Sequence, residues 1–215
     1  MGLRTIAVVA LAGWAGWLLF RGVVRRRVPW VGLAVLAVPL VLLGWTERQW
    51  VSAENVFSAV ARTVEPVAPG VHCQRIGESF LYAGAEAGHV EYDADGVPTG
   101  PAWLSYGTCT ALAQYWRSSA SEKSGPSLEE VMAVHVLSHE SYHLAGVRSE
   151  SVAECDAMQR DARTAQALGA SPLQARQLAT TYWLRVFPDM PPDYRSPDCR
   201  EGGRLDKTPG DGVWP

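Results

Sequence analysis

Two histidines with a glutamate between them are the residues of this chain best suited to do chemistry: His139-Glu140-Ser141-Tyr142-His143. On a helix, residues four apart project from the same face, with Cβ atoms about 5–6 Å apart. Two imidazoles at that spacing can bind one Zn²⁺ through bonds of about 2.0–2.1 Å. Glu140 is turned by about 100° from the first histidine. Its carboxylate is therefore expected beside the metal, where it can take a proton from water.

The motif lies near the end of a helix predicted over residues 128–145. Ser127 and Glu130 form a capping box before that helix, and Gly146 is placed to end it in a left-handed conformation. Within the helix, His135 lies one turn before the motif. It is about 12 Å along the axis from the second motif histidine, so the two cannot bind the same ion. We expect His135 to pack in the core or to support a ligand.

A third ligand is expected from the next helix, which is predicted from Ser149 to about Leu168. Glu150 and Glu154 share one face of it, and a turn at Gly146 would let its first turn face the two histidines. Two histidines and one glutamate on zinc leave the fourth position for water, which is typical of a catalytic site. The alternative is that both glutamates merely favour the helix N-terminus.

This arrangement resembles the gluzincin branch of the zincin metallopeptidases, in which HExxH is followed by a helix bearing E-x-x-x-D. The resemblance covers residues 127–168. It implies Glu150 as the third zinc ligand and Glu154 as the acid that orients a ligand histidine, with Glu154 as the alternative ligand. Glu154 stands where the family has Asp, and the gap from His143 to Glu150 is shorter than in well-known members. The metzincin extension is a poorer match, because Ser149 stands where its third histidine belongs.

The resemblance implies hydrolysis of peptide bonds, with Glu140 as general base toward a zinc-activated water. Zincins usually add a residue that stabilises the oxyanion, and the sequence leaves three candidates open: Arg148, Tyr182 and Tyr194. A second hypothesis is an inactive or metal-holding zincin-like domain that acts as a binding module in the cell envelope. Glu140 argues against it, since a structural metal site needs no base. A third hypothesis is a structural helical ectodomain without metal.

The first 46 residues contain two apolar runs and no acidic residue. Helices are predicted at about residues 5–20 and 28–45, each at the short end of what spans a bilayer core of about 30 Å. The arginine-rich loop 21–27 is expected in the cytoplasm by the positive-inside rule, which places both ends outside. Residues 1–46 are thus predicted to form a transmembrane hairpin of a multi-pass cell-membrane protein. The alternative is that the first run is a cleaved signal peptide.

All four cysteines follow the second apolar run: Cys73, Cys109, Cys155 and Cys199. An even number confined to an exported segment predicts two disulfides, with three possible connectivities. A zinc site made of thiolates is the weaker reading, because the sequence contains no C-x-x-C pair.

Residues 47–215 are predicted to form one extracytoplasmic domain. They carry 14 basic and 22 acidic residues, a formal charge of −8, which argues against nucleic acid as a partner. The expected partners are a peptide or protein substrate and the membrane, and nothing indicates an oligomeric state.

The expected fold is mainly α, or α+β with a small sheet: a two-helix transmembrane hairpin followed by a compact zincin-like helical domain. Apolar spacing predicts an amphipathic helix over residues 47–64. One or two strands are expected within Phe80–Asp93, from the segments Phe80-Leu81-Tyr82 and His89-Val90-Glu91-Tyr92, followed by a turn at Asp93–Gly96. Further helices are expected at about Thr108–Ser118 and Ser171–Phe187, with an irregular tail from residue 188.

Overall fold

The structure is a computed structural model of the 215-residue chain. It describes residues 3–25, 30–75, 78, 86–210 and 214–215. The chain divides into two compact units, residues 1–53 with 75–83 and residues 54–74 with 84–215. The predicted strand segment Phe80-Leu81-Tyr82 lies outside the described residues.

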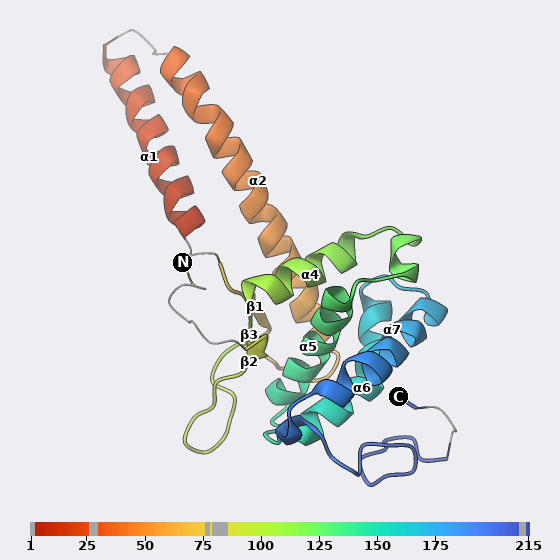
Figure 1. The fold of residues 1–215 in the computed structure, drawn as a ribbon. Coiled ribbons are helices and arrows are strands. Elements are labelled where there is room, and N and C mark those ends of the chain that lie inside the picture. Colours follow the sequence, from red (N-terminus) through yellow and green to blue (C-terminus); the bar gives the residue numbers. More distant parts are fainter. Residues whose placement is uncertain (1–2, 26–29, 76–77, 79–85, 211–213) are drawn as a thin grey trace. The chain divides into compact units, whose positions relative to one another are not determined.

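The first unit contains two long apolar helices, red and orange in Figure 1. Helix α1 spans Leu3–Val24, and α2 spans Trp30–Ala61 and continues into the second unit. Both are long and apolar enough to cross a membrane. Large apolar side chains such as Phe20 and Val31 are exposed on them, a surface that lipid favours and water does not. Helix α2 runs past the predicted end at residue 45, because the amphipathic segment that follows continues the same helix.

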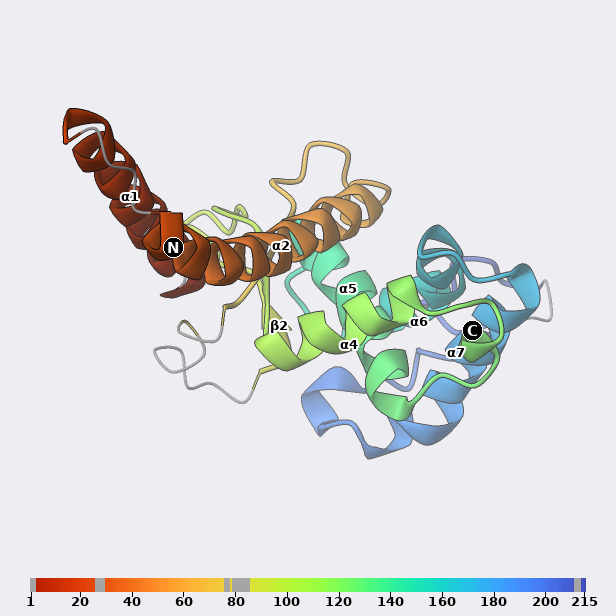
Figure 2. The same cartoon turned by 90° about the horizontal axis from the view of Figure 1, so that it is seen from above.

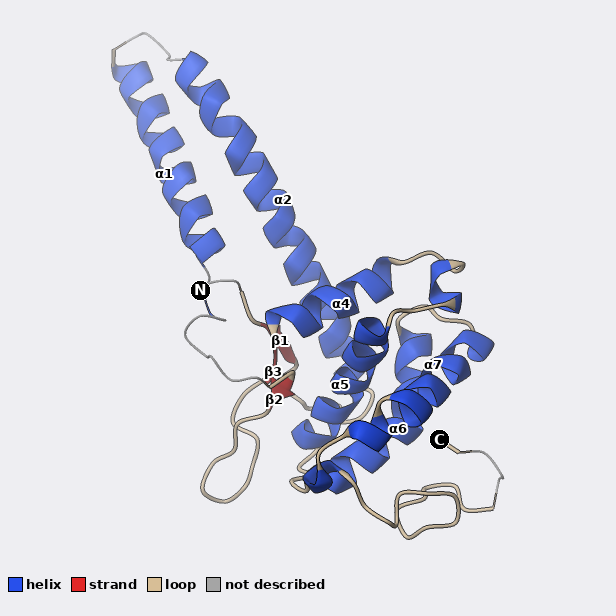
Figure 3. Ribbon diagram, in the orientation of Figure 1, coloured by secondary structure: helices blue, strands red, loops and turns tan. Residues whose placement is uncertain are grey.

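The second unit is mainly helical with a small three-stranded sheet, as the sequence predicts (Figure 3). Its helices are α4 (Tyr106–Arg117), α5 (Leu128–Leu144), α6 (Glu150–Ala167) and α7 (Pro172–Arg185). Three short 3₁₀ turns are η1 (Glu122–Ser124), η2 (Phe187–Asp189) and η3 (Pro192–Tyr194). The strands are β1 (Val71–Cys73), β2 (Gly88–His89) and β3 (Ala102–Leu104), in the order β1-β3-β2. Strand β1 is parallel to β3, and β2 is antiparallel to it.

The helix ends follow local chemistry, which is why the sequence predicts them within a few residues. The capping box of Ser127 and Glu130 is present at the start of α5, and Ser171 and Gln174 form another before α7. The side chain of Ser105 caps α4, which begins at Tyr106, two residues before its predicted start at Thr108. The strands are less predictable, since β1 and β3 are too short to show alternation. One strand of the predicted region Phe80–Asp93 is found among its described residues: β2, at Gly88–His89.

Both predicted disulfides are present, and the structure selects one of the three connectivities. Cys73 on β1 is bonded to Cys109 on α4. Cys155 on α6 is bonded to Cys199, which ties the largely irregular C-terminal tail to the helical body. Each such crosslink typically contributes about 2–4 kcal/mol by restricting the unfolded chain.

Helix α5 is the central element of the second unit. It contacts α4, α6, α7 and two strands, and the two views agree that α4 and α6 lie beside it (Figures 1 and 2). Its apolar residues Val131, Val134 and Leu137 are fully buried. The HExxH motif therefore begins inside the core rather than on the surface. Charged side chains that are buried in a core require partners.

Candidate metal centre

The third predicted ligand reaches the motif through a tight turn between α5 and α6. Gly146 has a φ of +88°, which favours glycine, and its N–H donates to the carbonyl oxygen of His143 at 2.9 Å. The N–H of Val147 donates to the carbonyl oxygen of Tyr142. This turn returns the chain so that Glu150, the first residue of α6, faces the motif. The short gap noted in the sequence is thus bridged by one turn.

Three side-chain atoms from the two helices converge at one point. Nε2 of His139 lies 2.9 Å from Nε2 of His143 and 3.1 Å from Oε2 of Glu150. The third distance, from His143 Nε2 to Glu150 Oε2, is 3.3 Å. Tetrahedral zinc bonds of about 2.0–2.1 Å place neighbouring ligand atoms about 3.3–3.4 Å apart. The three atoms can therefore hold one metal ion after movements of a few tenths of an ångström.

The contacts of the two histidines at Nδ1 leave the lone pair of each ring on Nε2, the atom that faces Glu150. Nδ1 of His143 lies 2.5 Å from the carbonyl oxygen of Val147, which can only accept, so Nδ1 carries the hydrogen. Burial and the neighbouring His139 lower the pKa of His143, which keeps its ring neutral and its Nε2 unprotonated. Nδ1 of His139 lies 3.2 Å from Oε2 of Glu154, close but off the direction of a good hydrogen bond.

Three acceptor atoms that face one another require a positive charge between them. Without a metal, a proton on His139 supplies it: burial lowers the pKa of this histidine, but Glu150 and Glu154 outweigh burial and raise it to about 9. A divalent cation satisfies the same demand with all three atoms at once. The cluster is therefore suited to a cation on electrostatic grounds as well as by distance.

Glu140, the candidate general base, is buried beside this cluster. Its Oε2 has no hydrogen-bond partner among the described residues, and burial raises its pKa to about 7. A carboxylate with a pKa near neutrality can both take up and release a proton at physiological pH. Strand β2 packs closely against it, because a Cβ added at Gly88 would lie 2.8 Å from Oε1 of Glu140. Sequence reasoning missed Gly88, although an isolated glycine in a strand often marks close approach.

The cluster opens into two adjoining hollows that share His139, Glu140 and Tyr194 in their walls. The first has a volume of about 240 Å³, and its apolar wall includes Met132, Val136, Met190 and Pro191. The second has a volume of about 250 Å³ and polar walls, including His89, Tyr92, Arg148 and Glu150. The candidate centre therefore lies where an apolar and a polar depression meet.

The three predicted oxyanion residues occupy different places. The Tyr182 hydroxyl donates to Oε1 of Glu154 at 2.6 Å, and the buried side chain lines the apolar hollow only. Arg148 lines only the polar hollow, where its guanidinium lies 5.6 Å from the ring centre of Tyr92. Tyr194 lines both hollows, with its ring centre 5.7 Å from that of His139. Burial, with nearby carboxylates, raises the pKa of Tyr194 to about 12, so its hydroxyl remains a donor.

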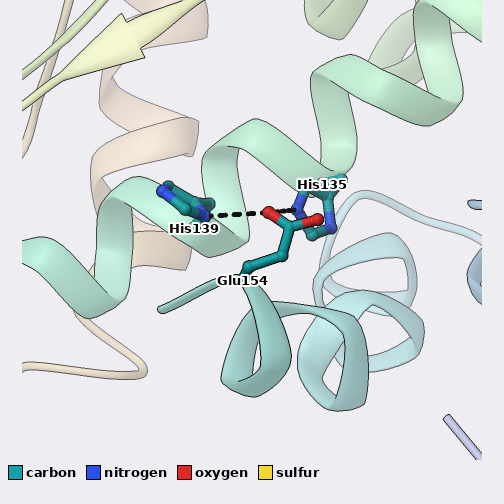
Figure 4. A group of neighbouring side chains, drawn as sticks. All are labelled: His135, His139 and Glu154. Atoms are coloured by element: carbon teal, nitrogen blue, oxygen red, sulfur yellow. Dashed lines mark hydrogen bonds and ion pairs between the residues drawn. The ribbon is translucent and has the colours of Figure 1, made fainter. Parts of the chain in front are cut away.

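A second group behind the first could also hold a metal ion: His135, His139 and Glu154, drawn in Figure 4. Oε2 of Glu154 lies 3.0 Å from Nε2 of His135, and Asp161 lies 2.8 Å from the other ring nitrogen of that histidine. Burial lowers the pKa of His135, but the two carboxylates outweigh burial and raise it to about 10. Sequence reasoning did not find Asp161, whose position on α6 carries no distinctive pattern.

The two groups differ in how their charges are satisfied. In the inner group, Glu154 and His135 already have hydrogen-bond partners, and all three side chains are buried. The inner group lines the apolar hollow, whereas the outer group of His139, His143 and Glu150 borders the polar hollow, whose walls suit water and polar ligands. The outer group is the better candidate for a functional metal.

Comparison with known proteins gives no match to a family model, to a curated protein or to a solved structure.

Proposed function

We propose that this protein is a zinc metallopeptidase of the gluzincin-like type. The observation that carries the proposal is the convergence of His139, His143 and Glu150 within 3.3 Å of one another beside the buried carboxylate of Glu140. Two imidazoles and one carboxylate are the donor set of many catalytic zinc sites, which leave one position open. The proposed assignment makes these three residues the zinc ligands and places Glu154 behind His139 as the orienting acid.

The chain's own groups supply acid–base chemistry and positioning. When bound, zinc would act as a Lewis acid toward a peptide carbonyl and toward water. Glu140 takes the proton of the attacking water and passes it to the departing amine, a role that suits a pKa of about 7. The Tyr194 hydroxyl, which remains protonated, donates a hydrogen bond to the oxygen that becomes negative.

A peptide substrate is favoured by the strand beside Glu140. Strand β2 is one of the two edge strands of the described sheet. The N–H of Ser105 donates to the carbonyl oxygen of Ala87, so by the alternation of antiparallel pairing the backbone groups of Gly88 point away from β3. Gly88 lines both hollows. An extended peptide that pairs with this edge would pass Glu140 along its length.

The hollows indicate which side chains such a peptide would carry. The apolar hollow shares Ala87, Met132 and Val136 with a further depression of about 330 Å³ between α4 and α5. Substrate residues on that side of the scissile bond are expected to be apolar. The polar hollow on the other side, with Arg148 at its wall, is suited to polar residues.

The proposal includes a location. Two helices long and apolar enough to cross a membrane precede the domain, and the two disulfides favour an oxidising compartment. Together with the arginine-rich loop, these features favour a multi-pass membrane protein with its catalytic domain outside the cytoplasm.

The proposal is tested on the full chain purified in detergent. Zinc content and hydrolysis of a peptide library are measured for the wild type, for Glu140→Gln and for Glu201→Gln, an exposed control. We expect one zinc per chain in all three proteins and loss of hydrolysis in Glu140→Gln alone. Equal hydrolysis by wild type and Glu140→Gln would contradict the peptidase proposal. Zinc without hydrolysis in any of them would favour a binding module, and no zinc would favour a structural ectodomain.

A further inference from the structure

Four polar side chains are buried together behind the candidate zinc ligands. His135, Glu154, Asp161 and Tyr182 are each at most 2 % exposed, and they come from α5, α6 and α7. Burying such groups costs free energy unless each finds a partner, and apolar residues would pack three helices more cheaply. Their presence in the core therefore indicates a role that packing alone does not need.

Their contacts hold Glu154 from several directions. His135 lies between two carboxylates, 2.8 Å from Oδ2 of Asp161 and 3.0 Å from Oε2 of Glu154. The Tyr182 hydroxyl donates to the other oxygen of Glu154 at 2.6 Å, and its ring stacks on that of His135 with centres 3.6 Å apart. Both ring nitrogens of His135 are therefore held by carboxylate oxygens.

Glu154 in turn faces His139. Its Oε2 lies between the rings of His135 and His139, as Figure 4 shows, and 3.2 Å from Nδ1 of His139. A neutral imidazole has one N–H and one lone pair. Although the two atoms are not aligned as in a good hydrogen bond, the negative charge of Glu154 beside Nδ1 favours the hydrogen on that nitrogen and leaves the lone pair on Nε2, which faces His143 and Glu150.

We infer that His135, Asp161 and Tyr182 are positioning residues: through Glu154 they make His139 bind a metal by Nε2 in the outer group and keep the inner group from binding one. With both nitrogens hydrogen-bonded to carboxylates, His135 has no nitrogen free to face an ion. The two groups share His139, so this arrangement decides between them. The inference rests on the metal site of the proposed function, but not on peptide hydrolysis.

The test is the zinc affinity of the full chain in detergent, measured by competition with a chelator. His135→Gln and Tyr182→Phe alter the cluster, whereas His143→Gln and Glu150→Gln alter the outer group. We expect the cluster variants to bind one zinc about 10- to 100-fold more weakly, as outer-shell changes typically do. The outer variants should lose more than that. Tyr182→Phe removes one hydroxyl and keeps the ring, so it serves if His135→Gln does not fold.

A second measurement separates positioning from packing. The chain has five histidines, so ¹⁵N imidazole spectra of the zinc-loaded protein are simple enough to assign. The wild type should show His139 with hydrogen on Nδ1 alone, and the cluster variants should show a second form. Unchanged affinity and unchanged His139 signals in both cluster variants would overturn the inference.

Three further outcomes also decide the matter. Stoichiometric zinc that survives in His143→Gln and Glu150→Gln but disappears in His135→Gln would place the metal in the inner group and overturn the inference. A wild type that binds no zinc would overturn it together with the proposed function. Zinc binding as expected without any peptide hydrolysis would support the inference and count against the peptidase alone.

Discussion

Glu150 Oε2 lies 3.1 Å from Nε2 of His139, although the two residues belong to different helices. The contact exists because the chain reverses at Gly146 and brings the first turn of α6 against the last turns of α5. A carboxylate held at this position, beside two imidazoles, gives the end of α5 a group of atoms that could hold a cation.

Removal of the metal is expected to destabilise the protein. An ion bound only by the folded state at 1,000 times its Kd contributes about 4 kcal/mol. In a domain of this size that corresponds to roughly 8–16 °C in Tm. Thermal melting of the zinc-loaded chain with and without chelator measures the difference. Glu150→Gln should melt at the same temperature in both conditions, and a chelator effect of full size in that variant would contradict the ligand assignment.

The buried carboxyl of Glu140 should make the metal-free protein less stable as pH rises. Burial raises its pKa to about 7, above the ordinary value of 4.5. Between these values the folded state keeps a proton that the unfolded chain releases, so stability falls as pH increases from about 4.5 to 7. The loss is at most about 3 kcal/mol. Glu140→Gln should therefore melt higher than wild type at pH 8 and alike at pH 4. A variant less stable than wild type at pH 8 would show that the carboxylate is stabilised instead.

A side chain at Gly88 should impair catalysis without removing the metal. The Cβ of Gly88→Ala would lie 2.8 Å from Oε1 of Glu140, so the carboxylate must shift. A misplaced catalytic group typically costs about 100-fold in rate. Peptide hydrolysis and zinc content measure the two effects separately. Gly100→Ala, whose Cβ would meet nothing within 4 Å, is the matched control and should behave as wild type.

Tyr194→Phe should lower kcat by about 100- to 1,000-fold and change KM little, because its hydroxyl is assigned to the charge that develops during reaction. Steady-state kinetics on one good peptide measure this. A rise in KM at constant kcat would instead assign Tyr194 to substrate binding. Arg148→Gln is measured for comparison, because Arg148 lines only the polar hollow whereas Tyr194 lines both hollows.

Met132 is expected to select apolar substrate residues. Met132→Gln places a polar group in the wall of the apolar hollow, where the loss of apolar contact is typically worth about tenfold or more in kcat/KM. Leu128→Gln changes an apolar side chain of similar exposure one turn earlier, outside the hollows. Peptides with apolar and polar residues on either side of the scissile bond are compared. An equal effect of both substitutions would remove Met132 from the specificity argument.

Local signals in the sequence determined much of this protein. Capping residues such as Ser127 and Ser171 mark where helices begin, because the free N–H groups of a first turn need an acceptor within three residues. The spacing of His139 and His143 places two imidazoles on one face of α5, since helical geometry relates residues four apart. These features depend only on residues close in the sequence, so they can be predicted without knowledge of the fold.

Tertiary structure alone decided which residues distant in the sequence contact the motif and each other. The approach of Gly88 to Glu140, the pairing of Cys155 with Cys199, and the placing of Tyr194 beside His139 join segments that no spacing relates. The same holds for Asp161 and Tyr182, whose contacts with His135 and Glu154 arise when α6 and α7 pack on α5. Such contacts depend on how helices are oriented and how loops close, and those are properties of the whole packed chain.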